Sequence, residues 1–399
     1  MEFSELIKTA TVENVLLSCA GLPAVRGTLC ITSHHLLLSS CPGGDLELWL
    51  LIRNVDAVEK RVQNLGWYQP PRTNSSARDT RLTGSSGTIT LRCKDLKVLQ
   101  LEIPGMEECL NIASSIEALS SVDSVMMMYP FFYRPPSLKL EEGWHQFPLE
   151  QYFQQISSQT SQWRLSLAAQ CMDREEATVL VHGAEGTDTT LLVTALAQVI
   201  LDPSCRTLAG FQGLLEREWI QAGHPFHLRC AHSAYSHARL KQEAPLFLLF
   251  LDCVWQLSRQ FPFSLEFGER LLLSLFDNAY ASAYGTFLCN NEKERSLCKV
   301  KESTHSLWAW LNRPEEQQKL LNPLYSHNAL VIWPSVEPQS IQLWQGLFLR
   351  WIRPSQHLDE AWAEIQRLVE ENNTPAKEST GNRLSQSLSD HTAGMENRR

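Results

Sequence analysis

GTITLRCKDLKVLQLEIPGMEECLNIASSIEAL, residues Gly87 to Leu119, sets the expected architecture of the first third of this chain. Two β-like runs, at 87–93 and 96–103, flank a Lys94-Asp95 turn and predict an antiparallel hairpin. From Met106 onward the apolar residues recur at helical spacing, which predicts a helix over 106–119. The stretch therefore predicts a hairpin that runs directly into an amphipathic helix.

Residues 1 to about 60, on the N-terminal side of this stretch, also indicate β-structure. Gly27 to Ser40 (GTLCITSHHLLLSS) contains an alternating segment and ends in a polar turn at 41–45. Further strands are predicted at Leu46 to Ile52 and at Val55 to Lys60. Antiparallel strands closed by one C-terminal helix are the plan of a pleckstrin-homology-like domain, and we expect residues 1–122 to form it around one core.

The segment from Val62 to Ser86 interrupts these strands with turn formers, mixed charge and no hydrophobic periodicity. A structureless stretch of this length is uncommon inside a compact domain. It is therefore predicted to be a solvent loop, 62–86, inserted into the sheet. Its arginines, Arg72, Arg78 and Arg81, could contact anionic lipid, but a merely solvated loop is the favoured interpretation.

After residue 122 the character of the chain changes from β to helical. A connector at 123–150 contains the proline-aromatic run Tyr129 to Pro136, where a domain boundary is expected. A β-like run is predicted at Ala177 to His182, and a final helix from Leu358 ends near Asn372, before a disordered tail. The other helices are predicted at Thr190–Leu201, Phe211–Trp219, Pro245–Gln260 and Ser306–Asn312.

Composition excludes several classes of protein. The chain has 399 residues, enough for two domains, and its net charge of −9 provides no basic field for nucleic acid. Its most apolar window, Leu246 to Leu251, is far shorter than the roughly 20 residues that span a bilayer. The eleven cysteines show no metal-ligand spacing, and no signal peptide is apparent. We expect a cytoplasmic protein with reduced thiols and neither metal nor cofactor.

VLVHGAEGTDTT, residues Val179 to Thr190, is the candidate functional site. A strand that enters a small-residue loop and then a helix can bind phosphate, because backbone N–H groups converge at the helix N-terminus. An anion site at Gly183 to Thr190 is one interpretation. A plain strand-to-helix turn is equally well supported, because two glycines are a weak signal.

The same loop resembles the signature of the myotubularin lipid phosphatases, V-H-C-S-D-G-W-D-R-T. Gly183 stands where that family carries its nucleophilic cysteine, and Thr189 stands where it carries its phosphate-binding arginine. The residues that match the signature are Val181, His182, Gly186, Asp188 and Thr190, whereas Ala184, Glu185 and Thr187 replace its Ser, Asp and Trp.

This resemblance implies a loop without phosphatase activity. Glycine has no side chain to act as nucleophile, and threonine cannot make the bidentate, charge-neutralising contact of arginine. Glu185 adds negative charge beside the expected phosphate position. Asp188 matches the position associated with the general acid, but it has no reaction left to assist. We therefore expect no catalytic residue and no enzyme.

Two other segments satisfy a bare Cys-x5-Arg pattern. Cys253 to Arg259 lies in a helical run, which places the two side chains on different faces. Cys289 to Arg295 encloses two carboxylates and no glycine. Neither is expected to be catalytic.

The resemblance to the myotubularin family extends along most of the chain. Residues 1–60 and 87–120 resemble its PH-GRAM domain, and Ala168 to about Leu368 resembles the C-terminal half of its phosphatase domain. After Trp163 to Ser166 the chain lacks a long segment that carries much of the family's central sheet. The expected fold is α+β: a PH-GRAM-type β-sandwich with a closing helix at 1–122, then a truncated, mostly helical remnant of an α/β cysteine-phosphatase domain at 151–355. Residues 356–399 should add a short helix and a tail.

The family resemblance, to its inactive branch, implies a pseudophosphatase that acts by interaction. Its expected partners are active myotubularins, and phosphoinositide membranes through the PH-GRAM domain, with a peripheral position on endomembranes. The final helix spans only about two heptads, which is marginal for a coiled coil. Lys94 and Lys97 could contact lipid or be ordinary solvated turn charges. The alternative is a poorly folded product of a decayed or alternatively spliced gene copy with no defined activity. Because most of the family's strands are expected to be absent, the apolar face of the Pro245–Gln260 helix is expected to stay partly exposed, which would make residues 150–370 unstable, oligomeric or dependent on a partner.

Overall fold

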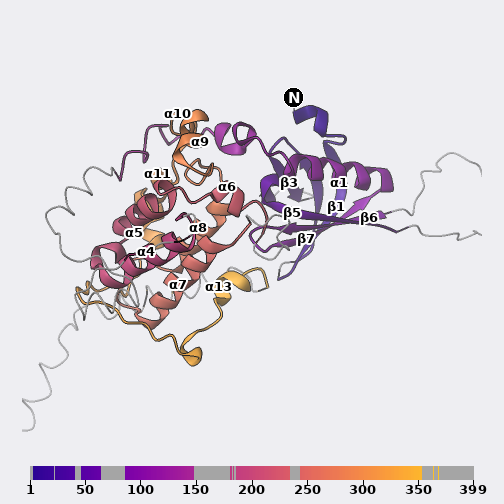
Figure 1. The fold of residues 1–399 in the computed structure, drawn as a ribbon. Coiled ribbons are helices and arrows are strands. Elements are labelled where there is room, and N and C mark those ends of the chain that lie inside the picture. The colour runs from indigo at the N-terminus through magenta and orange to yellow at the C-terminus, as the bar shows by residue number, and fades with distance from the viewer. Residues whose placement is uncertain are drawn as a thin grey trace, which may run out of the picture. The chain divides into compact units, whose positions relative to one another are not determined.

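The computed structural model describes residues 3–21, 23–40, 46–63, 86–147, 180–181, 183, 186–233, 243–352, 363 and 367. The chain divides into two compact units, Met1–Ser355 and Gln356–Arg399. The first unit contains nearly all the described residues, drawn as coloured ribbon in Figure 1. The predicted helix from Leu358 and the predicted tail lie almost entirely outside the described residues.

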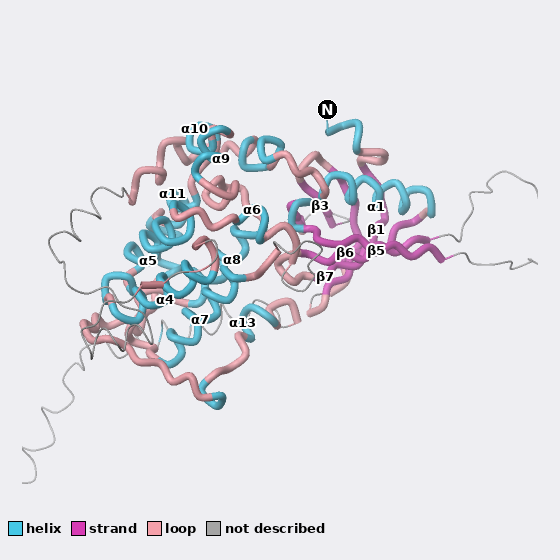
Figure 2. Tube along the Cα trace, viewed as in Figure 1, coloured by secondary structure: helices cyan, strands magenta, loops and turns pink. Residues whose placement is uncertain are grey.

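The described N-terminal residues form a seven-stranded antiparallel sheet, drawn in magenta in Figure 2, with the order β4-β3-β2-β1-β7-β6-β5. Neighbouring strands pair antiparallel, for example Leu29 with Leu38 and Ile89 with Leu101, and the register shifts once in the β1–β2 pair and once in the β5–β6 pair. The strands are β1 Thr11–Cys19, β2 Val25–Ile31, β3 His35–Ser40, β4 Glu47–Leu51, β5 Val55–Gln63, β6 Ser86–Cys93 and β7 Val98–Pro104.

Helix α1, Met106–Ser120, contacts strands β5, β6 and β7 of the sheet (Figure 1). Its buried residues include Cys109, Ile112 and Ile116, which share one hydrophobic core with the inward residues of the strands, such as Ile89 and Ile103. The prediction of a hairpin followed by this helix is confirmed. The two strands of the hairpin could be predicted because apolar and polar residues alternate along β6 and β7, and every second residue of both strands is buried.

Two features of the sheet differ from the sequence prediction. The sequence did not predict β1 as a separate strand. A bulge between Val12 and Val15, where Asn14 adopts a φ of 59°, breaks the alternation of buried and exposed residues. The segment 27–40 forms parts of two strands, β2 and β3, and not one. The turn between them is closed by the Thr32 hydroxyl, which accepts hydrogen bonds from the backbone N–H groups of His34 and His35.

The predicted inserted loop lies mostly outside the described residues. Strand β5 extends to Gln63 and β6 begins at Ser86, so the two ends of the predicted segment belong to the sheet. Residues 64–85, with Arg72, Arg78 and Arg81, are not among the described ranges.

Helices make up most of the rest of the first unit. The helices are α4 Thr189–Leu201, α5 Leu208–Leu215, the π-helix Glu216–Gln221, α6 Phe226–Arg229, α7 Leu246–Gln260, α8 Glu269–Tyr280, α9 Glu292–Leu297, α10 Val300–Ser303, α11 Leu307–Leu311, α12 Pro314–Leu320 and α13 Gln345–Phe348. Short 3-10 segments occur at Phe3–Leu6, Ile52–Asn54, Val125–Met127, Tyr129–Phe131, Pro203–Arg206 and Pro338–Ser340.

The predicted helices over 190–201, 245–260 and 306–312 are confirmed as α4, α7 and α11 to within one residue at each end. The predicted helix 211–219 is divided between α5 and the π-helix. Helix α8 has no counterpart among the predicted helices, although Leu271, Leu272, Leu275 and Phe276 recur at helical spacing and are buried.

These helices surround a second hydrophobic core, separate from that of the sheet. Helix α7 contacts α4 and α8, and these neighbours cover it (Figure 1). Six of its apolar residues are buried, and Leu249 alone among its large apolar residues is strongly exposed, at 47%. The expectation that the apolar face of this helix stays partly exposed is therefore wrong, because helices and not strands pack against it. Exposed apolar side chains occur instead after α12, at Leu330, Val336, Ile341 and Leu343.

Among the described helices, none is long and apolar enough to cross a membrane. In the same ranges, no group of three or more His, Cys, Asp or Glu side chains is arranged to hold a metal ion.

Candidate functional site

The loop singled out from the sequence leads into the N-terminus of α4. The structure describes Leu180, Val181, Gly183 and residues 186–190 of it, whereas His182, Ala184 and Glu185 lie outside the described residues. The predicted strand at 177–182 is likewise only partly described, and Leu180 and Val181 are not in a strand. Helix α4 begins at Thr189, with Asp188 at its N-cap position.

Two glycines shape the described part of the loop. Gly186 has a φ of +73°, in the left-handed region that glycine adopts readily, and a Cβ there would have nothing within 4 Å. A Cβ at Gly183 would lie 2.8 Å from Oγ1 of Thr190, so a side chain at 183 would point toward the first turn of α4. Thr189, the residue expected at the position of the phosphate-binding arginine, is exposed to solvent.

Asp188 is held by an arginine from α6. Its Oδ1 accepts a hydrogen bond of 3.0 Å from Nε of Arg229, and its Oδ2 accepts a second bond from Nη2 of the same guanidinium. The side chain of Arg229 is 10% exposed and that of Asp188 is 20% exposed. Because the carboxylate faces Arg229, it makes no capping hydrogen bond to α4.

His224, just before α6, completes this arrangement. Its Nδ1 lies 2.9 Å from the carbonyl oxygen of Thr187 and 3.3 Å from Oδ1 of Asp188. A carbonyl only accepts hydrogen bonds, so Nδ1 carries a proton and donates it. Burial lowers the pKa of His224 below its ordinary value, against smaller opposing effects from Thr187 and Asp188. The ring is therefore neutral at pH 7, and its buried Nε2 has no hydrogen-bond partner among the described residues.

Sequence reasoning did not identify His224 or Arg229 as part of the site. They follow the loop by 37 and 41 residues, so no local spacing connects them with Thr187 and Asp188. The available signal was EREWIQAGHPF, residues 216–226, which lies within the region of family resemblance from Ala168 to about Leu368 and ends three residues before Arg229.

The two Cys-x5-Arg segments do not form alternative sites. Cys253 lies in α7, and burial raises the pKa of its thiol to about 11, while the guanidinium of Arg259 lies 5.5 Å from the Trp255 ring centroid. Burial likewise raises the pKa of Cys289 to about 12. Nη1 of Arg295 donates to the carbonyl oxygens of Thr286 and Leu288, at 2.8 and 3.1 Å. Neither cysteine is therefore an activated thiolate beside an arginine that could bind phosphate.

The lysines of the β6–β7 turn are not solvated turn charges, so that interpretation is wrong. Lys94 is only 2% exposed, and burial, with the nearby Arg53 cation, lowers its pKa to about 7. The Lys97 ammonium lies 4.1 Å from the Trp351 ring centroid. The cause is tertiary packing: Nη2 of Arg350 and Nε1 of Trp351 donate to the Asp95 carbonyl oxygen at 3.0 and 2.7 Å, which brings the segment after α13 against the turn.

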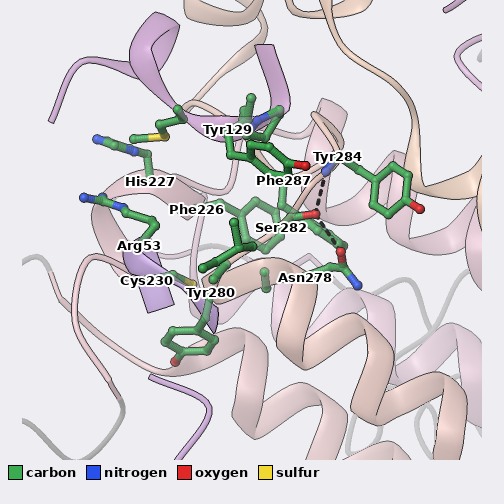
Figure 3. A pocket seen from close by; sticks show the side chains of 16 residues that line it. Arg53, Tyr129, Phe226, His227, Cys230, Asn278, Tyr280, Ser282, Tyr284 and Phe287 are labelled. Atoms are coloured by element: carbon green, nitrogen blue, oxygen red, sulfur yellow. Dashed lines mark hydrogen bonds between the residues drawn. The ribbon is translucent and has the colours of Figure 1, made fainter. Parts of the chain in front are cut away.

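A cavity of about 60 Å³ lies elsewhere in the first unit, between Arg53, Tyr129, His227 and the end of α8 (Figure 3). On its α8 side the Ser282 hydroxyl accepts from the Tyr284 backbone N–H and donates to Oδ1 of Asn278, as the dashed lines in Figure 3 show. Its volume holds only a few water molecules, whereas organic ligands occupy pockets of roughly 300–1,000 Å³. The cavity is therefore too small for an inositol phosphate headgroup.

The fold thus combines an antiparallel sheet closed by a helix with a helical region in which the candidate loop leads into α4. A model of the myotubularin-like phosphatase domain matches residues 165–296. The chain is 41% identical to a myotubularin-related protein 9-like protein of Bos taurus, over 92% of this chain and 96% of that protein. It is 26% identical to myotubularin-related protein 9 of Caenorhabditis elegans, over 98% and 94% of the two chains.

The chain therefore belongs to the myotubularin family. It is also 38% identical to a phosphatidylinositol-3,5-bisphosphate 3-phosphatase of Bos taurus, but over only 52% of this chain and 34% of that enzyme. The alignment with the Bos taurus myotubularin-related protein 9-like protein spans 543 positions, more than the 399 residues of this chain. It therefore includes positions at which this chain has no residue.

Proposed function

We propose that this chain is a catalytically inactive myotubularin that acts by binding other proteins or membranes. One observation carries the proposal: Gly183 and Thr189 stand where active members of the family have the nucleophilic cysteine and the phosphate-binding arginine. Hydrolysis by this family's route needs a thiolate to accept the phosphoryl group and a guanidinium to neutralise it. Neither group is present at these positions.

The contacts of Asp188 support the same proposal. A general acid must direct its proton toward the leaving group of the substrate. The Asp188 carboxylate instead receives two hydrogen bonds from Arg229 and lies 3.3 Å from Nδ1 of His224. These contacts give the retained aspartate a structural role, in which it ties the start of α4 to α6.

The domain organisation is part of the proposal. We assign residues 1–122 to a PH-GRAM-like domain, 123–150 to a linker, 151–355 to a truncated phosphatase-like domain, and 356–399 to a short helix and tail. The separate cores of the sheet and of the helices support the first and third assignments. The alignment that is longer than the chain supports the internal shortening.

The proposed partners are active myotubularins, and phosphoinositide-bearing endomembranes through the PH-GRAM-like domain. One partial relative is named as a phosphatidylinositol-3,5-bisphosphate 3-phosphatase, which identifies the kind of enzyme that an inactive relative would regulate. Because the helices of the phosphatase-like part bury a core of their own, the structure favours this proposal over a poorly folded product without activity.

The test compares this chain with that phosphatase. Phosphate release from phosphatidylinositol 3-phosphate and 3,5-bisphosphate is measured for each protein alone and for a mixture of both. We expect no release by this chain alone, co-purification of the two proteins, and a changed kcat/KM of the phosphatase in the mixture. Turnover by this chain would overturn its inactivity. Failure to bind either the phosphatase or phosphoinositide vesicles would overturn the binding function.

A further inference from the structure

Two glutamines of α7 hold the segment that precedes α13 (Figure 1). Nε2 of Gln260 donates to the carbonyl oxygen of Ser335 at 3.0 Å, and its Oε1 accepts from the N–H of the same residue at 2.8 Å. One turn earlier in the helix, Gln256 makes the same two bonds with Gln342, at 2.7 and 3.3 Å. Both ends of the segment are therefore fixed on one helix, and we call residues 336–341 between them the clamped loop.

Further hydrogen bonds fix the clamped loop internally. The Ser335 hydroxyl accepts from Oγ of Ser340 at 2.8 Å and from the N–H of Glu337 at 3.4 Å. A 3-10 turn, Pro338–Ser340, lies in the middle of the loop, and the N–H of Ser340 donates to the carbonyl oxygen of Glu337 at 2.8 Å. The loop thus has a defined conformation and presents its side chains in fixed positions.

The clamped loop and its flanks expose large apolar side chains. Val336 and Ile341, at the two ends of the loop, are 81% and 49% exposed. Next to the loop, Leu330, Trp333 and Leu343 are 73%, 38% and 55% exposed. Single exposed apolar residues are ordinary, but such a group within one segment of a folded protein indicates a surface that contacts an apolar partner.

The residue types favour a membrane as that partner. Between Leu321 and Leu349 the sequence contains a single Asp, Glu, Lys or Arg, which is Glu337. Protein–protein contacts are anchored mainly by Trp, Tyr and Arg, with Leu and Val under-represented, whereas the exposed group here is mostly aliphatic. Residues 336–339 are all exposed, so the loop is a raised surface, and a bilayer receives such a surface without a complementary pocket. Trp333 at its edge is a residue type that favours the membrane–water interface.

We propose that the clamped loop inserts Val336 and Ile341 into the boundary between the headgroups and the acyl chains of a membrane. This contact is separate from the proposed recognition of phosphoinositides by residues 1–122, because it depends on apolar burial and not on headgroup charge. The loop accordingly binds neutral phosphatidylcholine, and salt weakens the binding little, since screening acts on charges.

Co-sedimentation of the full chain with phosphatidylcholine vesicles, titrated with lipid at low and high salt, tests the proposal. The double substitution Val336→Ser and Ile341→Ser should lower the apparent partition coefficient by about tenfold. The matched control is Leu110→Ser with Leu297→Ser, at residues that are 43% and 72% exposed in α1 and α9, and it should leave the partition coefficient unchanged. Circular dichroism and thermal unfolding check that both double variants are folded.

Tryptophan quenching by phosphatidylcholine that is brominated on its acyl chains locates the contact. The chain has twelve tryptophans, and we expect Trp333→Phe to remove most of the quenching. Trp49→Phe, at a tryptophan that is 55% exposed in the sheet, should keep it.

Three results would overturn the proposal: no binding of the folded protein to neutral vesicles, equal losses in the two double variants, or quenching that Trp333→Phe leaves intact. A dimer of this chain that Val336→Ser and Ile341→Ser dissociates would assign the loop to a second copy and would also overturn it. Vesicles with added phosphatidylinositol 3-phosphate separate this proposal from the proposed function. If they bind the chain no better than neutral vesicles do, phosphoinositide recognition fails and the insertion of the clamped loop stands.

Discussion

Nε of Arg229 donates a 3.0 Å hydrogen bond to the carboxylate of Asp188, across 41 residues of the chain. We propose that Asp188 occupies a position of the family signature, and its contacts here are those of an ion pair with Arg229. The start of α4 is therefore tied to α6 through the Asp188 side chain.

Arg229→Ala should destabilise the fold, because it leaves the mostly buried Asp188 carboxylate without its main partner. Breaking a buried pair costs about 3–5 kcal/mol, and the 20% exposure of Asp188 reduces this to an expected 2–3 kcal/mol, as approximate values. Urea unfolding measures the change. Arg259→Ala, at an exposed arginine of α7, is the matched control and should cost less than about 1 kcal/mol. Equal effects of the two substitutions would contradict a structural role for the Asp188–Arg229 pair.

The double substitution Gly183→Cys and Thr189→Arg should not create a phosphatase. The new Cβ at 183 would lie 2.8 Å from Oγ1 of Thr190, and rotation of the Thr190 side chain about its χ1 bond would relieve this contact. Asp188 would still be bound to Arg229, and the proposed truncation of the domain would leave the site without the strands that support it in an active enzyme. Phosphate release from phosphatidylinositol 3-phosphate should equal that of the unmodified chain. A clear increase would mean that the shortened domain can still organise the reaction.

Stability should fall between pH 6.5 and 4 through His34. Burial, with a smaller effect of His35, lowers the pKa of His34 from 6.5 to about 4 in the folded protein. In this pH window the unfolded chain binds the proton more readily, so acidification favours unfolding, and the stabilising contribution of neutral His34 is complete only above pH 6.5. His34→Gln should flatten the stability profile in this window. His145→Gln, at an exposed position, serves as the control and should leave the slope unchanged.

Trp351 should contribute to stability through both its N–H group and its ring. Trp351→Phe removes the 2.7 Å hydrogen bond to the Asp95 carbonyl oxygen but keeps an aromatic ring near Lys97. We expect a loss of about 1 kcal/mol for Phe, and a larger loss for Trp351→Ala, which also removes the cation–π contacts. Chemical denaturation measures the free energy of unfolding of both variants and so separates the contribution of the hydrogen bond from that of the ring. If Phe and Ala were equally costly, the ring contacts would contribute nothing.

Residues 1–122 should fold as an isolated fragment, because the core shared by the sheet and α1 includes, among the described residues, none after Leu119. Circular dichroism and cooperative thermal unfolding test this. Lys94 should become more accessible to amine-reactive labels in the fragment than in the full chain, since Cys230 and Trp351 belong to segments that the fragment lacks. A fragment without a cooperative transition would show that the helical part is needed for the sheet to fold.

The sequence alone was sufficient to predict those elements and chemical properties that depend on local periodicity or on the residue types themselves. Strands β6 and β7 and helices α1, α4 and α7 follow from alternation and helical spacing, because each element buries one face. Strand β1 was not predicted from the sequence, because the bulge at Asn14 interrupts the alternation of its buried residues. The argument against catalysis is of the same local kind, since a glycine and a threonine lack the reactive groups in any fold.

Contacts between distant segments were decided only by the tertiary structure. The sequence contained Asp188 and Arg229, and also Asp95 and Trp351, but these partners are separated by 41 and 256 residues. Local propensity carries no information over such distances. Tertiary packing decides which charged groups become neighbours and whether a lysine in a turn is buried. Both depend on the contacts between segments that are distant in the chain, and these exist only in the folded protein.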